Sequence, residues 1–122
     1  MTTRYERVYS DAEIAERLAG DLGDWRHANG ALVRVYKTKD WRATMLAAGA
    51  VAHLAEAAWH HPEMVLNFPS LEVRLNTHSA NGITDKDFEL ARRIEHVVAW
   101  RPAADGGSLE GVPENVGYIL PD

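Results

Sequence analysis

Hydrophobic and polar residues follow two periods along this chain, one typical of helices and one typical of strands. Residues 11–20 begin with a capping-box pattern, and their apolar positions then recur at helical spacing. Two strand-like runs follow at residues 25–28 and 31–38, and between them stands Asn29-Gly30, a pair that suits a tight type I′ turn. These patterns predict a short helix followed by a β-hairpin.

The period changes at Asp40, where a long helical pattern begins. Apolar residues recur there at steps of three and four and form the stripe Trp41, Met45, Ala48, Ala52, Ala55 and Trp59. Pro62 lacks a backbone donor and disfavours helical geometry at the residue before it. We therefore expect one helix from Asp40 to about His60, with this stripe on its buried face.

The second half of the chain predicts strands and a last helix. Residues 71–78 alternate between apolar and polar side chains, as in a strand with one buried face, and a shorter strand at 66–68 is its candidate partner. Thr84 and Asp87 form a second capping box. The helix that follows is apolar at positions that share one face: Phe88, Ala91, Ile94 and Val98. Two hairpin-like units favour an antiparallel sheet with helices on one face.

Length and composition narrow the class of protein. The 122 residues suit a single domain, and the segment after Trp100 is rich in glycine and proline, so we expect 101–122 to be a loop-like extension in which only residues 116–120 dock. Lys and Arg number 13 against 18 Asp and Glu, and the net charge of -5 argues against a nucleic-acid partner. There is no cysteine, which excludes disulfides, thiolate metal sites and cysteine nucleophiles. Without a signal-like or membrane-spanning apolar segment, we expect a soluble cytoplasmic protein.

Histidines near the end of the long helix are the strongest candidates for chemistry. Glu56 and His60 lie four residues apart, so we expect them to touch on one helix face. A carboxylate beside an imidazole orients the ring for acid–base work. Pro62 should turn the adjacent His61 away from that face, while His78 arrives from the end of the predicted strand. Three imidazoles and one carboxylate could then converge where helix and strand end.

Less specific interpretations of these histidines also exist. A histidine at a helix C-terminus is often a surface residue that the helix dipole favours, and His27 and His96 are expected at the surface. His60, His61 and His78 could instead form a three-histidine zinc site. Adjacent residues rarely aim both rings at one ion, however, so we expect no metal. Serine nucleophile elbows, phosphate-binding loops and dinucleotide fingerprints are absent.

Residues 55–97 resemble the core of the pterin-4a-carbinolamine dehydratase family. The shared features are Glu56 four residues before the first histidine, the His60-His61-Pro62-Glu63 block, an aromatic residue at Phe68, the Thr77-His78 strand end, and Gly82-Ile83-Thr84 followed by Asp87. The spacing of 18 residues from His60 to His78 also matches the family pattern. Upstream the likeness is looser, and the similarity covers roughly residues 10–99.

The resemblance implies an α+β, two-layer fold with a four-stranded antiparallel sheet and three helices on one face, in which residues 1–100 form the domain. It also implies a hydro-lyase that converts 4a-hydroxytetrahydropterin to quinonoid dihydropterin, in the recycling of the tetrahydrobiopterin used by aromatic amino acid hydroxylases. No metal or cofactor is implied. The implied partners are the pterin and further copies of the chain in a homodimer or homotetramer.

By the same resemblance, His60 and His78 carry the acid–base chemistry, and Glu56 orients His60. The residues implied at the substrate are His61, which holds the pterin, Pro62, which fixes the direction of the pair, Trp59 and Thr77.

Three features depart from the family pattern. Trp59 stands where a small polar residue is usual, and Met64 stands where an aromatic residue is common, so both are expected to alter the pocket wall. The extension beyond Trp100 would cover the site or change the assembly surface. A second hypothesis is therefore a catalytically weak, protein-binding member of the fold, acting as a dimerisation cofactor or assembly factor.

Overall fold

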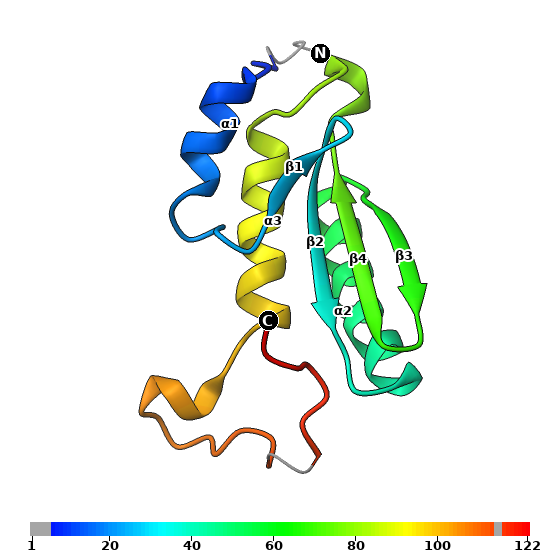
Figure 1. The fold of residues 1–122 in the computed structure, drawn as a ribbon, viewed down its shortest axis with the longest axis vertical. Coiled ribbons are helices and arrows are strands. Elements are labelled where there is room, and N and C mark those ends of the chain that lie inside the picture. The colour runs from blue at the N-terminus through cyan, green and yellow to red at the C-terminus, as the bar shows by residue number, and fades with distance from the viewer. Residues whose placement is uncertain (1–5, 114–115) are drawn as a thin grey trace.

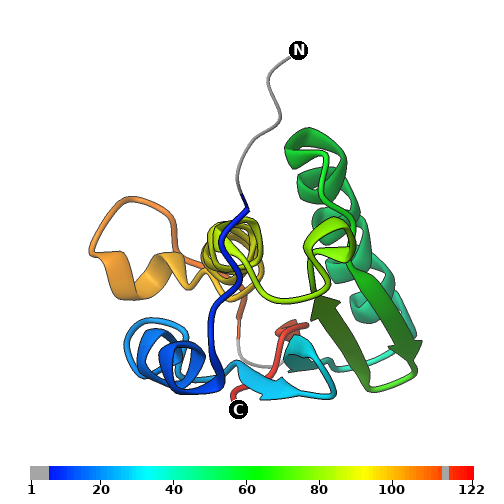
Figure 2. The same cartoon turned by 90° about the horizontal axis from the view of Figure 1, so that it is seen from above.

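The computed structural model describes residues 6–113 and 116–122 and has the predicted α+β architecture. Its elements, in chain order, are α1 (Asp11–Leu18), β1 (Arg26–Ala28), β2 (Ala31–Lys37), α2 (Trp41–Ala58), β3 (Glu63–Asn67), β4 (Ser70–Leu75), the 3₁₀ turn η1 (His78–Ala80), α3 (Asp85–Val98) and the 3₁₀ turn η2 (Pro102–Asp105). The strands form one antiparallel sheet in the order β1-β2-β4-β3. The helices lie on one side of the sheet, with α1 beside α3 and the β1 edge (Figures 1 and 2).

The β1–β2 connection is the tight hairpin that the sequence predicts. Ala28 pairs with Ala31, so Asn29 and Gly30 form a two-residue turn, and both have positive φ, 52° and 76°. Type I′ turns require this geometry, which asparagine and glycine tolerate better than other residues. The turn is therefore a rigid feature at one end of the sheet.

The core lies between the sheet and the two longer helices. The alternating residues of β4, Leu71, Val73 and Leu75, are fully buried, and they belong to one hydrophobic cluster with Phe88 and Ile94 of α3, which are also fully buried. Both predicted capping boxes are present, at Ser10 for α1 and at Thr84 for α3. Local signals in the sequence therefore place these helices and their buried faces correctly.

The predicted buried stripe of α2 is wrong at several positions. Trp41, Met45, Ala52 and Trp59 are exposed, whereas the buried face consists of Ala43, Thr44, Ala47, Ala48, Val51 and Ala55. Small residues occupy much of α2, so its apolar periodicity fits more than one face. The face with small side chains packs inward because it lets α2 approach the sheet and α3 closely, and the large side chains stay outside.

The C-terminal extension is tied to the end of β2. Lys39 N–H donates to Tyr118 O at 3.0 Å, and Leu120 N–H donates to Lys37 O at 2.9 Å. Ile119 is buried, which confirms that the predicted docking segment contacts the domain. Because Lys37 lies at the opposite end of β2 from the hairpin turn, the described part of the extension sits far from that turn (Figure 1). The division of the chain at residue 100 stays a prediction.

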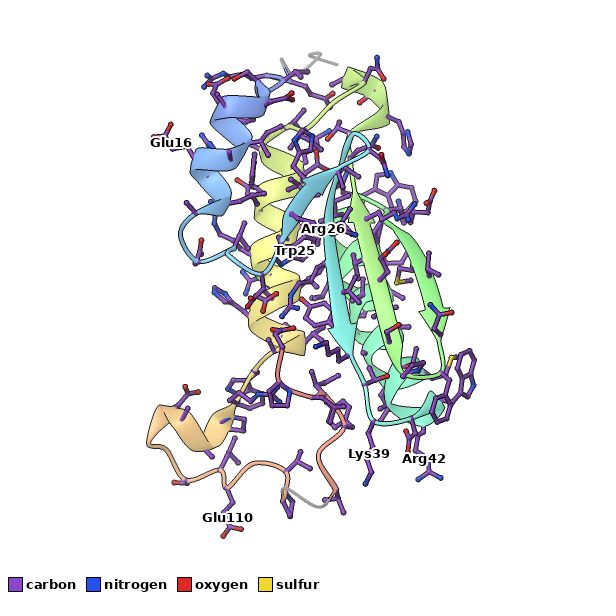
Figure 3. The ribbon with its side chains drawn as sticks, viewed as in Figure 1. Glu16, Trp25, Arg26, Lys39, Arg42 and Glu110 are labelled. Carbon is purple, nitrogen blue, oxygen red and sulfur yellow. The ribbon has the colours of Figure 1, made fainter. Side chains whose placement is uncertain are left out.

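A buried ion network joins β2, α3 and the extension. Arg34 is 3% exposed, and its guanidinium donates to Glu95 on one side, at 2.9 and 3.1 Å, and to Asp122 on the other, at 2.7 and 2.9 Å. Glu95 also accepts from Tyr36 and from Trp25, which lies between β1 and α3 (Figure 3), each at 2.9 Å. Glu95 and Asp122 therefore neutralise the buried arginine from two sides, and Glu95 also joins it to Trp25 and to Tyr36 of β2.

Replacing this glutamate tests the network. Burial opposes the charge of Glu95, but hydrogen bonds from Arg34 and Tyr36 outweigh it and hold the pKa of Glu95 below its ordinary value. A lowered pKa in the folded state stabilises the protein above the unfolded-state pKa, and this contribution is lost as pH falls through the folded value. We expect Glu95→Gln to lower the free energy of unfolding by about 3 kcal/mol at pH 7 and to weaken its fall below about pH 4. Urea unfolding across pH measures both effects.

The control is Glu89→Gln, which makes the same change at an exposed position of the same helix. We expect it to shift stability by less than about 0.5 kcal/mol. Equal effects of the two substitutions would contradict the assigned role of Glu95.

Candidate active site

Helix α2 ends at Ala58, two residues before the predicted end at about His60, through a left-handed residue at Trp59. Trp59 has φ 52° and ψ 46°. His60 N–H donates to Ala55 O at 3.1 Å, and Trp59 N–H donates to Glu56 O at 3.2 Å. These two bonds form a Schellman motif, in which glycine usually occupies the left-handed position. His60 and His61 therefore follow the helix rather than continue it.

The contacts of the two histidines are the reverse of those predicted. His61 Nε2 lies 2.7 Å from Glu56 Oε1, and His60 Nε2 lies 2.7 Å from Asp87 Oδ1. The predicted Glu56–His60 contact is wrong because it assumes helical geometry through His60. The left-handed turn at Trp59 brings His61 back over the last turn of α2, where the Trp59 ring also meets it edge-on at 4.9 Å.

Asp87 holds His60 from the N-terminus of α3. The carboxylate is fully buried, and its second oxygen accepts hydrogen bonds from Thr77 Oγ1 at 2.8 Å and from the backbone N–H of Thr84 at 2.9 Å. Thr77 is itself buried, so it contacts Asp87 rather than lining an open site. The sequence marks Asp87 as the third residue of a capping box but gives no sign of its contact with His60, because the two lie 27 residues apart.

A small polar cavity lies where α2, β3, β4 and the β1–β2 hairpin end together. It has a volume of about 130 Å³, and its polar lining comes from Asn29, His61, Glu63, Arg74, Asn76 and His78. Figure 1 shows the hairpin turn, the end of β4 and η1 at this same end of the sheet. The structure therefore brings His61 and His78 to one cavity.

His60 faces a neighbouring groove between α2 and α3. This groove is wide and open, and His60, Trp59, Lys86 and Arg93 are among its lining residues. The His60 side chain is 13% exposed, whereas His61 is half exposed. Met64 does not line either hollow, contrary to expectation, because its side chain packs against the hydrophobic core.

The arrangement offers groups for proton transfer. Two imidazoles have one ring nitrogen fixed by a carboxylate, while the ring of His78 has no hydrogen-bond partner among the described residues. Positioned imidazoles of this kind serve as general acids and bases near neutral pH. Within residues 6–113 and 116–122, no group of three or more His, Cys, Asp or Glu side chains is placed to hold a metal ion, and no helix is long and apolar enough to cross a membrane.

The strain at Trp59 leads to a testable prediction. A non-glycine residue in the left-handed region costs roughly 1–2 kcal/mol, and Trp59 is 76% exposed, so it contributes little packing. We expect Trp59→Gly to keep or raise the free energy of unfolding, by up to about 1 kcal/mol. As a control, Ala52→Gly places glycine at an exposed position in the interior of α2, where φ is helical, and should lower stability by about 1 kcal/mol. If Trp59→Gly destabilised the protein as much, the ring contact with His61 would outweigh the strain.

Known proteins resemble this chain in sequence and in fold. A sequence model of the family described as Pterin 4 alpha carbinolamine dehydratase matches residues 7–97. A relative from Aquifex aeolicus is 37% identical over 92 residues, covering 75% of this chain and 92% of the relative, and one from Haloarcula marismortui is 42% identical over 90 residues, covering 74% and 95%. Both are named provisionally as pterin-4-alpha-carbinolamine dehydratases.

A solved structure agrees with these sequence matches. The crystal structure described as a transcriptional coactivator/pterin dehydratase from Brucella melitensis superposes with a TM-score of 0.69 at 30% sequence identity, covering 75% of this chain and 99% of that one. The family match spans most of the chain and includes every residue of the cavity and of the His60–Asp87 contact. The chain belongs to the pterin 4 alpha carbinolamine dehydratase family.

Proposed function

We propose that this protein dehydrates a 4a-hydroxytetrahydropterin to the quinonoid dihydropterin, within the recycling of tetrahydropterins. The observation that carries the proposal is the meeting of His61 and His78 at one cavity, with His60 held by a buried carboxylate at the neighbouring groove. The family and the names of its relatives support the substrate class.

The reaction needs proton transfer alone. The C4a–O bond breaks, the hydroxyl leaves as water after gaining a proton, N5 loses its proton, and a C4a=N5 double bond forms. No electrons are exchanged with another molecule. Imidazoles have an ordinary pKa of about 6.5 and can act as acid or base at neutral pH, and each such group typically contributes about 10²- to 10⁴-fold.

We assign the proton transfers to His60 and His78. With Nε2 of His60 bound to Asp87, its Nδ1 is the ring nitrogen left for the substrate, and no described residue bonds it. The exposed ring of His78 is equally available. Asp87 takes the orienting role expected of Glu56, and Thr77 acts by holding Asp87.

We assign substrate binding to His61. Glu56 and the Trp59 ring fix its orientation from the end of α2, and Pro62 sets the direction of the chain into β3. Glu56 therefore serves the binding histidine, and Trp59 has a place in the site as its support.

Turnover tests the proposal. Purified protein should accelerate the decay of enzymatically generated 4a-hydroxytetrahydropterin, followed by ultraviolet absorbance. We expect His60→Ala and His78→Ala each to lower kcat/KM by about 100-fold or more, since each removes an acid–base group. His96→Ala, which changes an exposed histidine outside both hollows, is the control and should leave the rate unchanged.

The result against the proposal would be folded wild-type protein with no rate above buffer. Normal turnover in the His60 and His78 variants would contradict the assigned roles while leaving the reaction in place.

We also propose that the chain assembles into a homodimer or homotetramer in the cytoplasm, whose reducing conditions suit a chain without cysteine. Large apolar side chains of α2 are exposed, with Trp41 at 49%, Met45 at 47% and Leu46 at 58%. Exposed apolar patches often mark protein interfaces. The same face would suit a protein partner, the role that the coactivator name of the Brucella protein suggests.

Light scattering tests the assembly. Wild-type protein should have the mass of a dimer or tetramer, and Leu46→Glu should reduce it because a charge would be buried in the interface. Leu109→Glu, at a comparably exposed leucine of the extension, is the control and should leave the mass unchanged. A monomeric wild type that captures one stoichiometric partner and shows no turnover would favour the protein-binding role instead.

A further inference from the structure

The small polar cavity has a wall that the acid–base chemistry does not use. The β1–β2 hairpin turn contributes Asn29 to this wall, while His61 enters from the β3 side. In the strand order β1-β2-β4-β3, these two residues lie on opposite sides of the end of β4. A flat ring bound across that end would therefore meet Asn29 at one edge and the histidines at the other.

The charged groups of the cavity are already paired. Arg74 Nη1 lies 3.4 Å from Glu63 Oε1, and Arg74 Nε donates to Glu72 Oε2 at 2.5 Å. His61 is bound to Glu56. By contrast, the side-chain amide of Asn29 has no hydrogen-bond partner among the described residues. On the hairpin side of the cavity, the side-chain group left to bind a ligand is therefore a neutral amide. Such an amide suits a neutral polar ring better than an anion.

A pterin presents a matching edge. Its pyrimidine ring is neutral and carries a cyclic amide, with a donor at N3–H and an acceptor at O4. A carboxamide can donate to the acceptor and accept from the donor in parallel, as asparagine does with the edge of adenine. C4 of this cyclic amide is bonded directly to C4a, the reacting carbon, so an anchor at this edge holds C4a within the cavity.

We propose that Asn29 binds the N3–H/C4=O edge of the pterin and is a positioning residue for the reacting carbon. The inference rests on the proposed function for its substrate. The turn is well suited to this task because Asn29 is fixed at φ 52° between paired strands, so the amide is presented without a mobile loop. Asn29 thus forms the turn with its backbone and binds the pterin edge with its side chain.

The positive φ of Asn29 makes a clean test available. Asn29→Gly removes the amide and keeps the turn geometry, since glycine accepts this conformation. Asn81 is also an asparagine at φ 52° but does not line the cavity, so Asn81→Gly is the matched control. A second variant, Asn29→Asp, keeps a turn-forming residue and replaces the amide donor with an acceptor. Circular dichroism and thermal melts establish that each variant is folded.

Equilibrium titration with 7,8-dihydropterin, which lacks the 4a-hydroxyl and cannot react, measures binding by itself. A bidentate pair contributes about 1–3 kcal/mol of discrimination, so we expect Asn29→Gly to raise Kd by roughly tenfold or more. In the dehydration assay the loss should fall on KM rather than on kcat. Asn81→Gly should bind as the wild type does.

A probe with a 4-amino group in place of the 4-oxo group tests the contact. The amide can turn to pair with either edge, so we expect the wild type to bind both 7,8-dihydropterin and 2,4-diamino-7,8-dihydropteridine and Asn29→Gly to bind both more weakly. Asn29→Asp has acceptors only, so we expect it to prefer the diamino compound, whose 4-amino group donates. An unchanged Kd in folded Asn29→Gly would overturn the inference, as would an equal loss in Asn81→Gly.

The two proposals fail separately. If the wild type dehydrates the substrate and Asn29→Gly has the wild-type KM, the role of Asn29 is wrong and the proposed reaction stands. If binding depends on Asn29 but no dehydration occurs, the pterin site stands and the reaction is wrong. A wild type that neither binds dihydropterin nor dehydrates the substrate overturns both.

Discussion

The buried carboxylate of Asp87 is the point on which the site depends. It caps the first turn of α3, accepts from Thr77 at the end of β4, and binds His60 in the α2–β3 connection. Three segments that are distant in the chain meet at this one group. Because a buried charge without partners is strongly unfavourable, these contacts fix one another's positions. The same interaction that starts the helix therefore orients the histidine to which we assign proton transfer.

The two ends of the sheet have separate roles in this fold. At one end, α2, β4 and the β1–β2 hairpin finish together and form the polar cavity, so each contributes side chains from a rigid terminus. At the other end, backbone hydrogen bonds at Lys37 and Lys39 attach the extension, and Asp122 reaches Arg34 in the middle of β2. The described part of the extension consequently does not line the cavity, and its last residue completes the buried network of Arg34 and Glu95.

Sequence patterns predict the features that depend on residues close together in the chain. The capping boxes at Ser10 and Thr84, the Asn29-Gly30 turn and the alternation of Leu71, Val73 and Leu75 each involve residues close in the chain, and all are present. The contacts of the histidines were not predictable in this way. A single backbone choice at Trp59 decides whether Glu56 meets His60 or His61, and tryptophan is an unusual residue for a left-handed position. The contacts of Asp87 with His60 and of Asp122 with Arg34 span long separations that periodicity does not report.

We propose above all that a pterin binds at the end of the sheet where His61 and His78 meet, with His60 at the neighbouring groove. A crystal structure of the protein with 7,8-dihydropterin tests this directly. We expect the ring to lie across the end of β4, with His61 and His78 in contact with it and Nδ1 of His60 turned towards it. A ring bound elsewhere, for example in the apolar cavity between α3 and the extension that Trp100 and Leu120 line, would show that the pterin site is wrongly placed.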